Sequence, residues 1–76
     1  MNKQRRKEIA QALAMVETAK GILEACRDEE QDYFDNMPES FQSGQKGEEA
    51  QAAIDALEEA SSLMEDVSNA LDELAG

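Results

Sequence analysis

Two segments decide the fold of this 76-residue chain: Ile9–Met37, IAQALAMVETAKGILEACRDEEQDYFDNM, and Ala50–Leu74, AQAAIDALEEASSLMEDVSNALDEL. In each segment apolar residues recur at alternating steps of three and four, which keeps them on one face of an α-helix. The first stripe, in which Glu30 is the one charged member, is Ile9, Ala12, Val16, Ala19, Leu23, Cys26, Glu30, Tyr33 and Met37. The second stripe is Ala50, Ala53, Leu57, Ala60, Met64, Val67, Leu71 and Leu74. The sequence therefore predicts an all-α protein, an antiparallel hairpin of two amphipathic helices.

Pro38, the only proline, marks the turn between the two helices. A proline pushes the residue before it away from helical geometry, and Gly44 is a suitable residue to end a following short turn. We expect a single domain, residues 1–76, with helix one over about 3–36, a helical turn over about 38–43 and helix two over about 48–75. Residues 45–47 are expected to form the connection, and Phe41 is expected to fold back over the core.

One register of the hairpin brings the two stripes together throughout, pairing Ala19 with Val67, Leu23 with Met64 and Cys26 with Ala60. Further apolar residues widen both stripes: Leu13, Met15, Ile22, Phe34, Ile54, Leu63 and Ala70. Stripes wider than a two-stranded seam are typical of helices in a multi-helix bundle. We therefore expect self-association, as a homodimer that forms a four-helix bundle or as a higher oligomer.

The composition argues against enzymatic chemistry. The chain has no histidine, which removes the commonest general acid or base and the usual partner of a nucleophile. Its one cysteine, Cys26, lies on the first stripe and is expected to be a core thiol in a reducing cytoplasm. Carboxylates alone can hold Mg²⁺ or Ca²⁺, and Glu29 and Asp32 could face Asp55 and Glu58. No complete motif is present, so we predict no catalytic residues, no metal and no cofactor.

The net charge of -11 comes from 18 acidic and 7 basic residues. This balance argues against direct binding of nucleic acid and suits a basic protein partner, although excess carboxylate can also serve solubility alone. No run of about 18 apolar residues exists that would span a membrane, and the start of the chain lacks the apolar stretch of a signal peptide. We expect a cytoplasmic protein without membrane contact.

Four of the basic residues gather at the start of the chain: Lys3, Arg5, Arg6 and Lys7. A helix N-terminus ordinarily favours acids, so these cations need a partner. In a hairpin they are expected to lie beside Asp66, Asp72 and Glu73 and to be neutralised by them. The alternative is an anion-binding patch in which Arg5, Arg6 and Lys7 hold a small anionic nucleotide.

The end of helix one combines carboxylates with aromatic rings. We predict that partner binding is carried there, because aromatic residues surrounded by charge are typical anchors of interfaces. The predicted partner-binding residues are Asp28, Glu29, Asp32, Tyr33, Phe34, Asp35 and Glu39. Glu30 on the apolar stripe is expected to pair with Arg27, or else to be a polar specificity device inside the bundle.

The basic start NKQRRK (2–7), the segment RDEEQDYFDNMPES (27–40) and the second helix rich in Ala, Glu and Leu resemble small coil-containing proteins of bacterial phages and prophages. The resemblance implies a phage-encoded protein that binds a component of the host, including host defence factors. Three hypotheses follow: an inhibitor whose acidic surface binds a host nucleic-acid-binding or defence protein in the host cytoplasm, a sponge for a small signal nucleotide, and a structural or assembly module.

Overall fold

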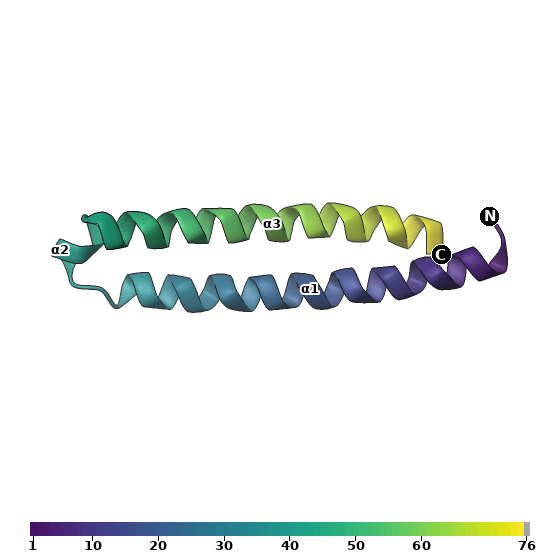
Figure 1. The fold of residues 1–76 in the computed structure, drawn as a ribbon, viewed down its shortest axis with the longest axis horizontal. Coiled ribbons are helices and arrows are strands. Elements are labelled where there is room, and N and C mark those ends of the chain that lie inside the picture. The colour runs from purple at the N-terminus through teal and green to yellow at the C-terminus, as the bar shows by residue number, and fades with distance from the viewer. Residues whose placement is uncertain (76) are drawn as a thin grey trace.

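The computed structural model describes residues 1–75 and shows a long helical hairpin (Figure 1). Helix α1 spans Lys3–Asp35, the short α2 spans Glu39–Gln42, and α3 spans Gln45–Ala75. Helices α1 and α3 run antiparallel and side by side, and the molecule measures 58 × 14 × 13 Å. No strand occurs within the described range. The predicted all-α hairpin is confirmed.

Asparagine side chains complete both ends of α1. The side chain of Asn2 accepts a hydrogen bond from the backbone N–H of Arg5 at 2.8 Å, the usual role of an N-cap residue. At the other end the side-chain amide of Asn36 donates to the carbonyl of Asp32 at 2.8 Å. Pro38 then prevents continuation of the helix, so α1 ends at Asp35.

The start of α3 differs from the sequence-based prediction. A connection is predicted over residues 45–47, but α3 already begins at Gln45 and Gly47 is buried inside it. A Cβ atom at Gly47 would collide with the backbone of Gln42 in α2. Only glycine permits this close approach, which lets α2 pack directly on the first turns of α3 without a linker.

Gln42, rather than Phe41, fastens the tip of the hairpin. Its Nε2 donates a hydrogen bond to the carbonyl of Phe34 at 3.0 Å and so ties α2 to the last turn of α1. The prediction that Phe41 covers the core is wrong, because its side chain is 52% exposed. The Nζ atom of Lys46 lies 5.8 Å from the centre of the Phe41 ring, within the range of a cation–π contact.

The two long helices meet along a seam of residues spaced three and four apart. On α1 the seam is half-buried and consists of Ile9, Leu13, Val16, Lys20, Leu23, Arg27, Glu30, Phe34 and Met37. On α3 it consists of Gly47, Ala50, Ile54, Leu57, Ser61, Met64, Ser68, Leu71 and Ala75. Within residues 1–75, full burial occurs only at Gly47, Ala50 and Ile54, close to the tip. The core of a single hairpin is therefore thin.

The seam differs from the predicted stripes at every second position. There the residue that follows the predicted one on α1 enters the seam: Arg27 replaces the exposed Cys26, and Lys20 is half-buried beside the equally half-buried Ala19. The expectation of a core thiol is wrong for the hairpin, because Cys26 is exposed. The register itself is close to the predicted one, because Lys20 meets Glu65 and Arg27 meets Glu58.

Candidate functional site

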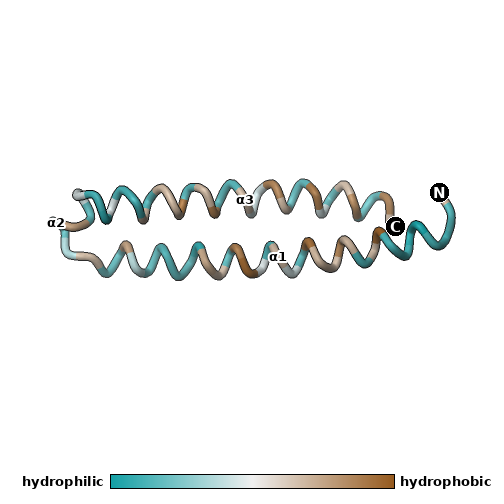
Figure 2. The backbone as a smooth tube through the Cα atoms, viewed as in Figure 1, coloured by the Kyte–Doolittle hydropathy of each residue, from teal (hydrophilic) through white to brown (hydrophobic). Residues whose placement is uncertain are grey.

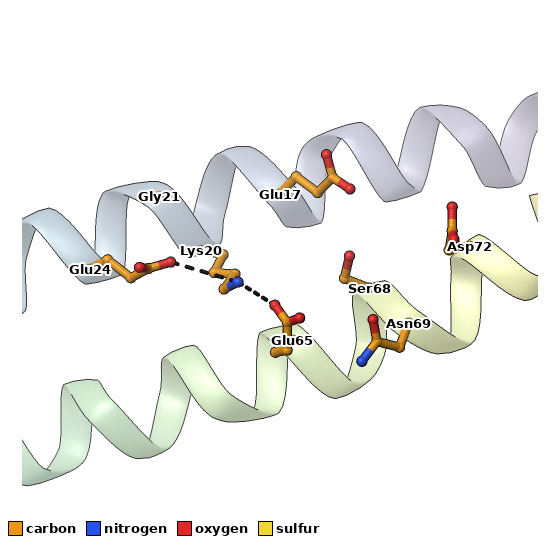
Figure 3. A pocket seen from close by; sticks show the side chains of 8 residues that line it. All are labelled: Glu17, Lys20, Gly21, Glu24, Glu65, Ser68, Asn69 and Asp72. Carbon is orange, nitrogen blue, oxygen red and sulfur yellow. Dashed lines mark hydrogen bonds and ion pairs between the residues drawn. The ribbon is translucent and has the colours of Figure 1, made fainter.

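One face of the hairpin carries a polar groove between α1 and α3 (Figure 3). Its lining residues are Glu17, Lys20, Gly21, Glu24, Glu65, Ser68, Asn69 and Asp72. In Figure 3 the Lys20 side chain reaches from α1 toward Glu65 on α3, while Glu24 approaches it from its own helix. A second groove continues toward the tip and adds Arg27, Glu58, Ser61 and Ser62.

Two cations cross this face, and carboxylates engage both. Lys20 donates a hydrogen bond to Glu65 and lies 3.8 Å from a carboxylate oxygen of Glu24. The hydrogen bond to Glu65 raises the pKa of Lys20 above its ordinary value of 10.5. Desolvation opposes this rise in the pKa, and the charges of Glu65, Glu24 and Glu17 add to it. Arg27 lies 3.7 Å from Glu58 across the hairpin and 3.2 Å from the neighbouring Asp28. Both cations are therefore already paired with carboxylates.

The residues that follow each seam residue in the sequence share this face on both helices, as the linings of the two grooves show. Positions seven apart lie on the same side of a helix in a coiled-coil pair, so the face extends beyond the grooves along both helices. We call it the acidic face; its carboxylates are Glu17, Glu24, Asp28, Asp35, Glu48, Asp55, Glu58, Glu65 and Asp72.

The opposite face is formed by residues that precede each seam residue, and between Ala12 and Tyr33 on α1 and between Ala53 and Leu74 on α3 all of these residues except Glu29 are apolar. We call it the apolar face; it consists of Ala12, Met15, Ala19, Ile22, Cys26, Tyr33, Ala53, Ala56, Ala60, Leu63, Val67, Ala70 and Leu74. Met15 is 72% exposed, Ile22 59% and Leu63 55%. Six of the eight exposed large hydrophobic side chains in the described part of the chain belong to this face, so the exposure is concentrated rather than scattered.

The predicted partner-binding residues do not form one surface. Asp28 and Asp35 belong to the acidic face, and the amide of Gln31 donates to Asp35 at 2.9 Å. Glu29 and Tyr33 precede seam residues and therefore lie on the opposite side, with Tyr33 54% exposed. Of the remaining three residues, Asp32 lies on the outer side of α1, Phe34 lies in the seam, and Glu39 lies at the start of α2.

The predicted pairing of Arg27 with Glu30 is also absent from residues 1–75, because Arg27 contacts Glu58 and Asp28 instead. Glu30 is half-buried in the seam near the tip. The four carboxylates considered for a metal do not converge, since Glu29 and Asp32 lie away from the face that holds Asp55 and Glu58. No group of three or more His, Cys, Asp or Glu residues in the described range has the arrangement of a metal site.

The basic residues at the start of α1 project beyond the end of α3. Figure 2 shows this hydrophilic first part of α1, drawn in teal, extending past the C-terminal end of the hairpin. We call it the basic arm; its cations are Lys3, Arg5, Arg6 and Lys7, all exposed. The prediction that Asp66, Asp72 and Glu73 neutralise them is wrong for residues 1–75, where none of the salt bridges involves an arm residue. The arm overhangs because the register places Lys20 opposite Glu65, which leaves the first turns of α1 without a neighbour on α3.

Sequence reasoning identified the extra apolar residues that widen the stripes, but it missed the acidic face and the separation of the two faces, although a signal for each exists. Glu58, Glu65 and Asp72 follow one another at seven-residue spacing, as do Glu17 and Glu24. Such spacing of like charges indicates a continuous charged side of a helix pair. The apolar face carries the same spacing in Met15 and Ile22.

In the described residues, neither long helix contains a stretch apolar enough to cross a lipid bilayer. Comparison with known proteins found no matching family model, no matching curated protein and no matching solved structure.

Proposed function

We propose that this chain is a non-enzymatic binding protein that acts as a self-associated hairpin and presents its acidic face to a basic protein. The observation that carries the proposal is the separation of the two surfaces. Carboxylates gather on one side of the hairpin, and most of the exposed large apolar side chains gather on the other.

The apolar face supports self-association. Monomeric soluble proteins rarely expose contiguous apolar patches of this kind, and such patches commonly mark protein contacts. The hairpin itself buries only Gly47, Ala50 and Ile54 fully, and a chain of this length gains little stability from its own core. Packing a second copy against the apolar face would enlarge the core, as in a four-helix bundle.

The acidic face supports binding of a basic partner. Its two cations, Lys20 and Arg27, are already engaged, and the chain carries a net charge of -11. An excess of one sign along a groove accelerates the encounter with a partner of opposite charge and suppresses encounters with like-charged proteins. A surface of this kind suits proteins whose basic residues bind nucleic acid. The resemblance to phage and prophage proteins makes a host protein of that class, including a defence factor, the proposed target.

The basic arm supports a second candidate function. Its four cations are exposed and lie outside the salt bridges of residues 1–75, so they are available to a small anionic nucleotide, as in a sponge. The test is thermal melting with and without nucleotides, because a ligand that binds the folded state raises the melting temperature. An increase that disappears in the triple variant Arg5→Ala/Arg6→Ala/Lys7→Ala supports this candidate.

The main proposal is tested by affinity capture from bacterial lysate with two variants that remove the same charges. The test variant is Glu58→Gln/Glu65→Gln/Asp72→Asn on the acidic face. The control is Glu59→Gln/Asp66→Asn/Glu73→Gln, one residue further along α3 and outside that face. We expect the wild type and the control to retain the same basic protein at low salt and to release it at high salt. The test variant should fail to retain this protein. Equal retention by all three proteins contradicts the proposal.

A further inference from the structure

The apolar face is large enough for a second copy of the chain, but only just. It extends from Ala12 to Tyr33 on α1, about 30 Å of helix, and it is two helices wide, about 20 Å. Its footprint is thus about 600 Å² on each copy, and a pair would bury about 1,200 Å², the lower limit for a stable protein interface. At this limit, the charges that surround the apolar face decide how the two copies are arranged.

Two symmetric arrangements place one apolar face on the other. In the first, the tips of both hairpins lie at the same end, and α1 packs on α3 of the partner. In the second, the hairpins point in opposite directions, and α1 packs on α1 of the partner. Neighbouring helices are antiparallel in both arrangements, so the helix dipoles do not favour either. The distribution of side-chain charge does distinguish them.

The tip of the hairpin is strongly acidic, whereas the other end combines the basic arm with the α3 carboxylates Asp72 and Glu73. The basic arm supplies four of the seven cations of the chain and has Glu8 as its nearest acid. At the tip, residues 28–49 contain eight carboxylates and one cation, Lys46. The carboxylates are Asp28, Glu29, Glu30, Asp32, Asp35, Glu39, Glu48 and Glu49. With both tips at one end, tip would lie beside tip, which is repulsive, whereas each arm would lie beyond the end of the partner's α3 and diagonal to the partner's arm.

In opposite directions the same charges attract. Superposing the two apolar faces brings Ala12 of one copy opposite Tyr33 of the other, and residues 3–7 then lie over residues 38–42. The arm cations come within side-chain reach of Glu39 and Glu49 of the partner, whereas their own α3 ends before it could reach them. Because each copy has one arm and one tip, both ends of the dimer are neutralised in the same way.

We infer that two copies pair through their apolar faces in opposite directions, with the basic arm of each on the acidic tip of the other. The inference rests on the proposed self-association and adds the partner, the direction and the role of the arm. It leaves the acidic face of both copies on the outside of the dimer.

Spin labels measure the direction. In a Cys26→Ser background, labels at Ser40→Cys in both copies should lie nearly as far apart as the 58 Å length of the hairpin. Mixing chains labelled at Gln4→Cys with chains labelled at Ser40→Cys should give a short distance. A short distance between the two tips overturns the inferred direction while leaving self-association intact, and a monomeric mass at about 100 μM, well above the micromolar range of many specific complexes, contradicts both.

The arm gives a second test, in which the sign of the effect decides. Neutralising it with Arg5→Gln/Arg6→Gln/Lys7→Gln should weaken the dimer several-fold at low salt, because each exposed ion pair contributes only a little, and by less at high salt. The tip variant Glu39→Gln/Glu49→Gln should also weaken it, and combining both sets should add little further loss. Tighter association after neutralising the tip contradicts the inference, because that is the effect expected when two tips lie side by side.

Discussion

Lys20 on α1 donates a hydrogen bond to Glu65 on α3, which joins two residues 45 positions apart in the sequence. A second cross-hairpin pair, Arg27 with Glu58, lies seven residues further along α1 and seven residues earlier on α3. The two contacts repeat at the heptad spacing of an antiparallel helix pair. They fix the register and mark the side of the seam on which the carboxylates gather.

The Lys20–Glu65 contact predicts a loss of stability at alkaline pH. Glu65 raises the pKa of Lys20 in the folded chain above 10.5, while the unfolded chain keeps the ordinary value. The stabilising contribution is therefore complete below about pH 10.4 and is lost as the pH rises through the raised pKa. The melting temperature between pH 9 and pH 12 should fall less steeply for Lys20→Gln than for the wild type. Equal slopes would show that the contact does not contribute.

Two glycines inside helices should respond to alanine in opposite ways. Gly47→Ala places a Cβ against the backbone of Gln42 and should destabilise the hairpin by about 2 kcal/mol or more, because α2 must move away. Gly21→Ala meets open space and should stabilise α1 by about 0.5–1 kcal/mol. Urea denaturation of both variants measures the difference, and a tolerated Gly47→Ala would contradict the close packing of α2 on α3.

Hydrophobic periodicity predicts the two helices and their antiparallel pairing, but it misplaces every second position of the seam by one residue. It excludes Lys20 and Arg27 because they are charged. Both nevertheless lie in the seam, where long basic side chains can bury their aliphatic stems and keep their charged groups at the edge. The predicted stripe thus combines seam residues, such as Val16 and Leu23, with residues of the apolar face, such as Ala19 and Cys26. A helix in a four-helix bundle buries both of these sides.

The candidate site was less accessible to sequence reasoning than the fold. The aromatic residues near the turn suggest one binding surface, but helical rotation separates Tyr33, on the apolar face, from its neighbour Phe34, in the seam. Successive helical residues differ by about 100° in direction, so a cluster in the sequence is not a cluster in space. The overhang of the basic arm depends on the register, and a register is a tertiary property that local patterns do not determine.

Ser61 provides a test of the packing in the seam. Its Oγ atom is buried and has no hydrogen-bond partner among the described residues. Ser61→Ala should raise the free energy of unfolding by about 1 kcal/mol, because an unsatisfied hydroxyl is removed and alanine favours the helix. Ser62→Ala, at an exposed neighbouring position, is the control and should give only the helix-propensity gain of about 0.5 kcal/mol. A smaller gain at Ser61 than at Ser62 would mean that the hydroxyl has a partner.

The apolar face should be separable from the fold by mutation. Ile22 and Leu63 are more than half exposed in the hairpin, so Ile22→Glu/Leu63→Glu should leave the helical circular dichroism signal of the folded chain in place while reducing the mass in light scattering to that of a monomer. Leu57→Asp in the seam is the contrasting variant and should unfold the hairpin, at a cost of about 3 kcal/mol or more. Retained association of Ile22→Glu/Leu63→Glu would show that copies pair through another surface.

The reactivity of Cys26 should depend on protein concentration. The thiol is exposed in the single hairpin and lies on the apolar face, so a second copy packed on that face would shield it from a water-soluble thiol reagent. We expect fast labelling of Cys26 at concentrations below the dissociation constant of the dimer and labelling slowed roughly tenfold or more above it, since the reagent then reaches only the minor monomer population. The variant Ile22→Glu/Leu63→Glu should label fast at every concentration, which separates shielding by a second copy from shielding within the hairpin. Labelling rates of the wild type that do not change with concentration, while light scattering reports a dimer, would place Cys26 and its face outside the interface.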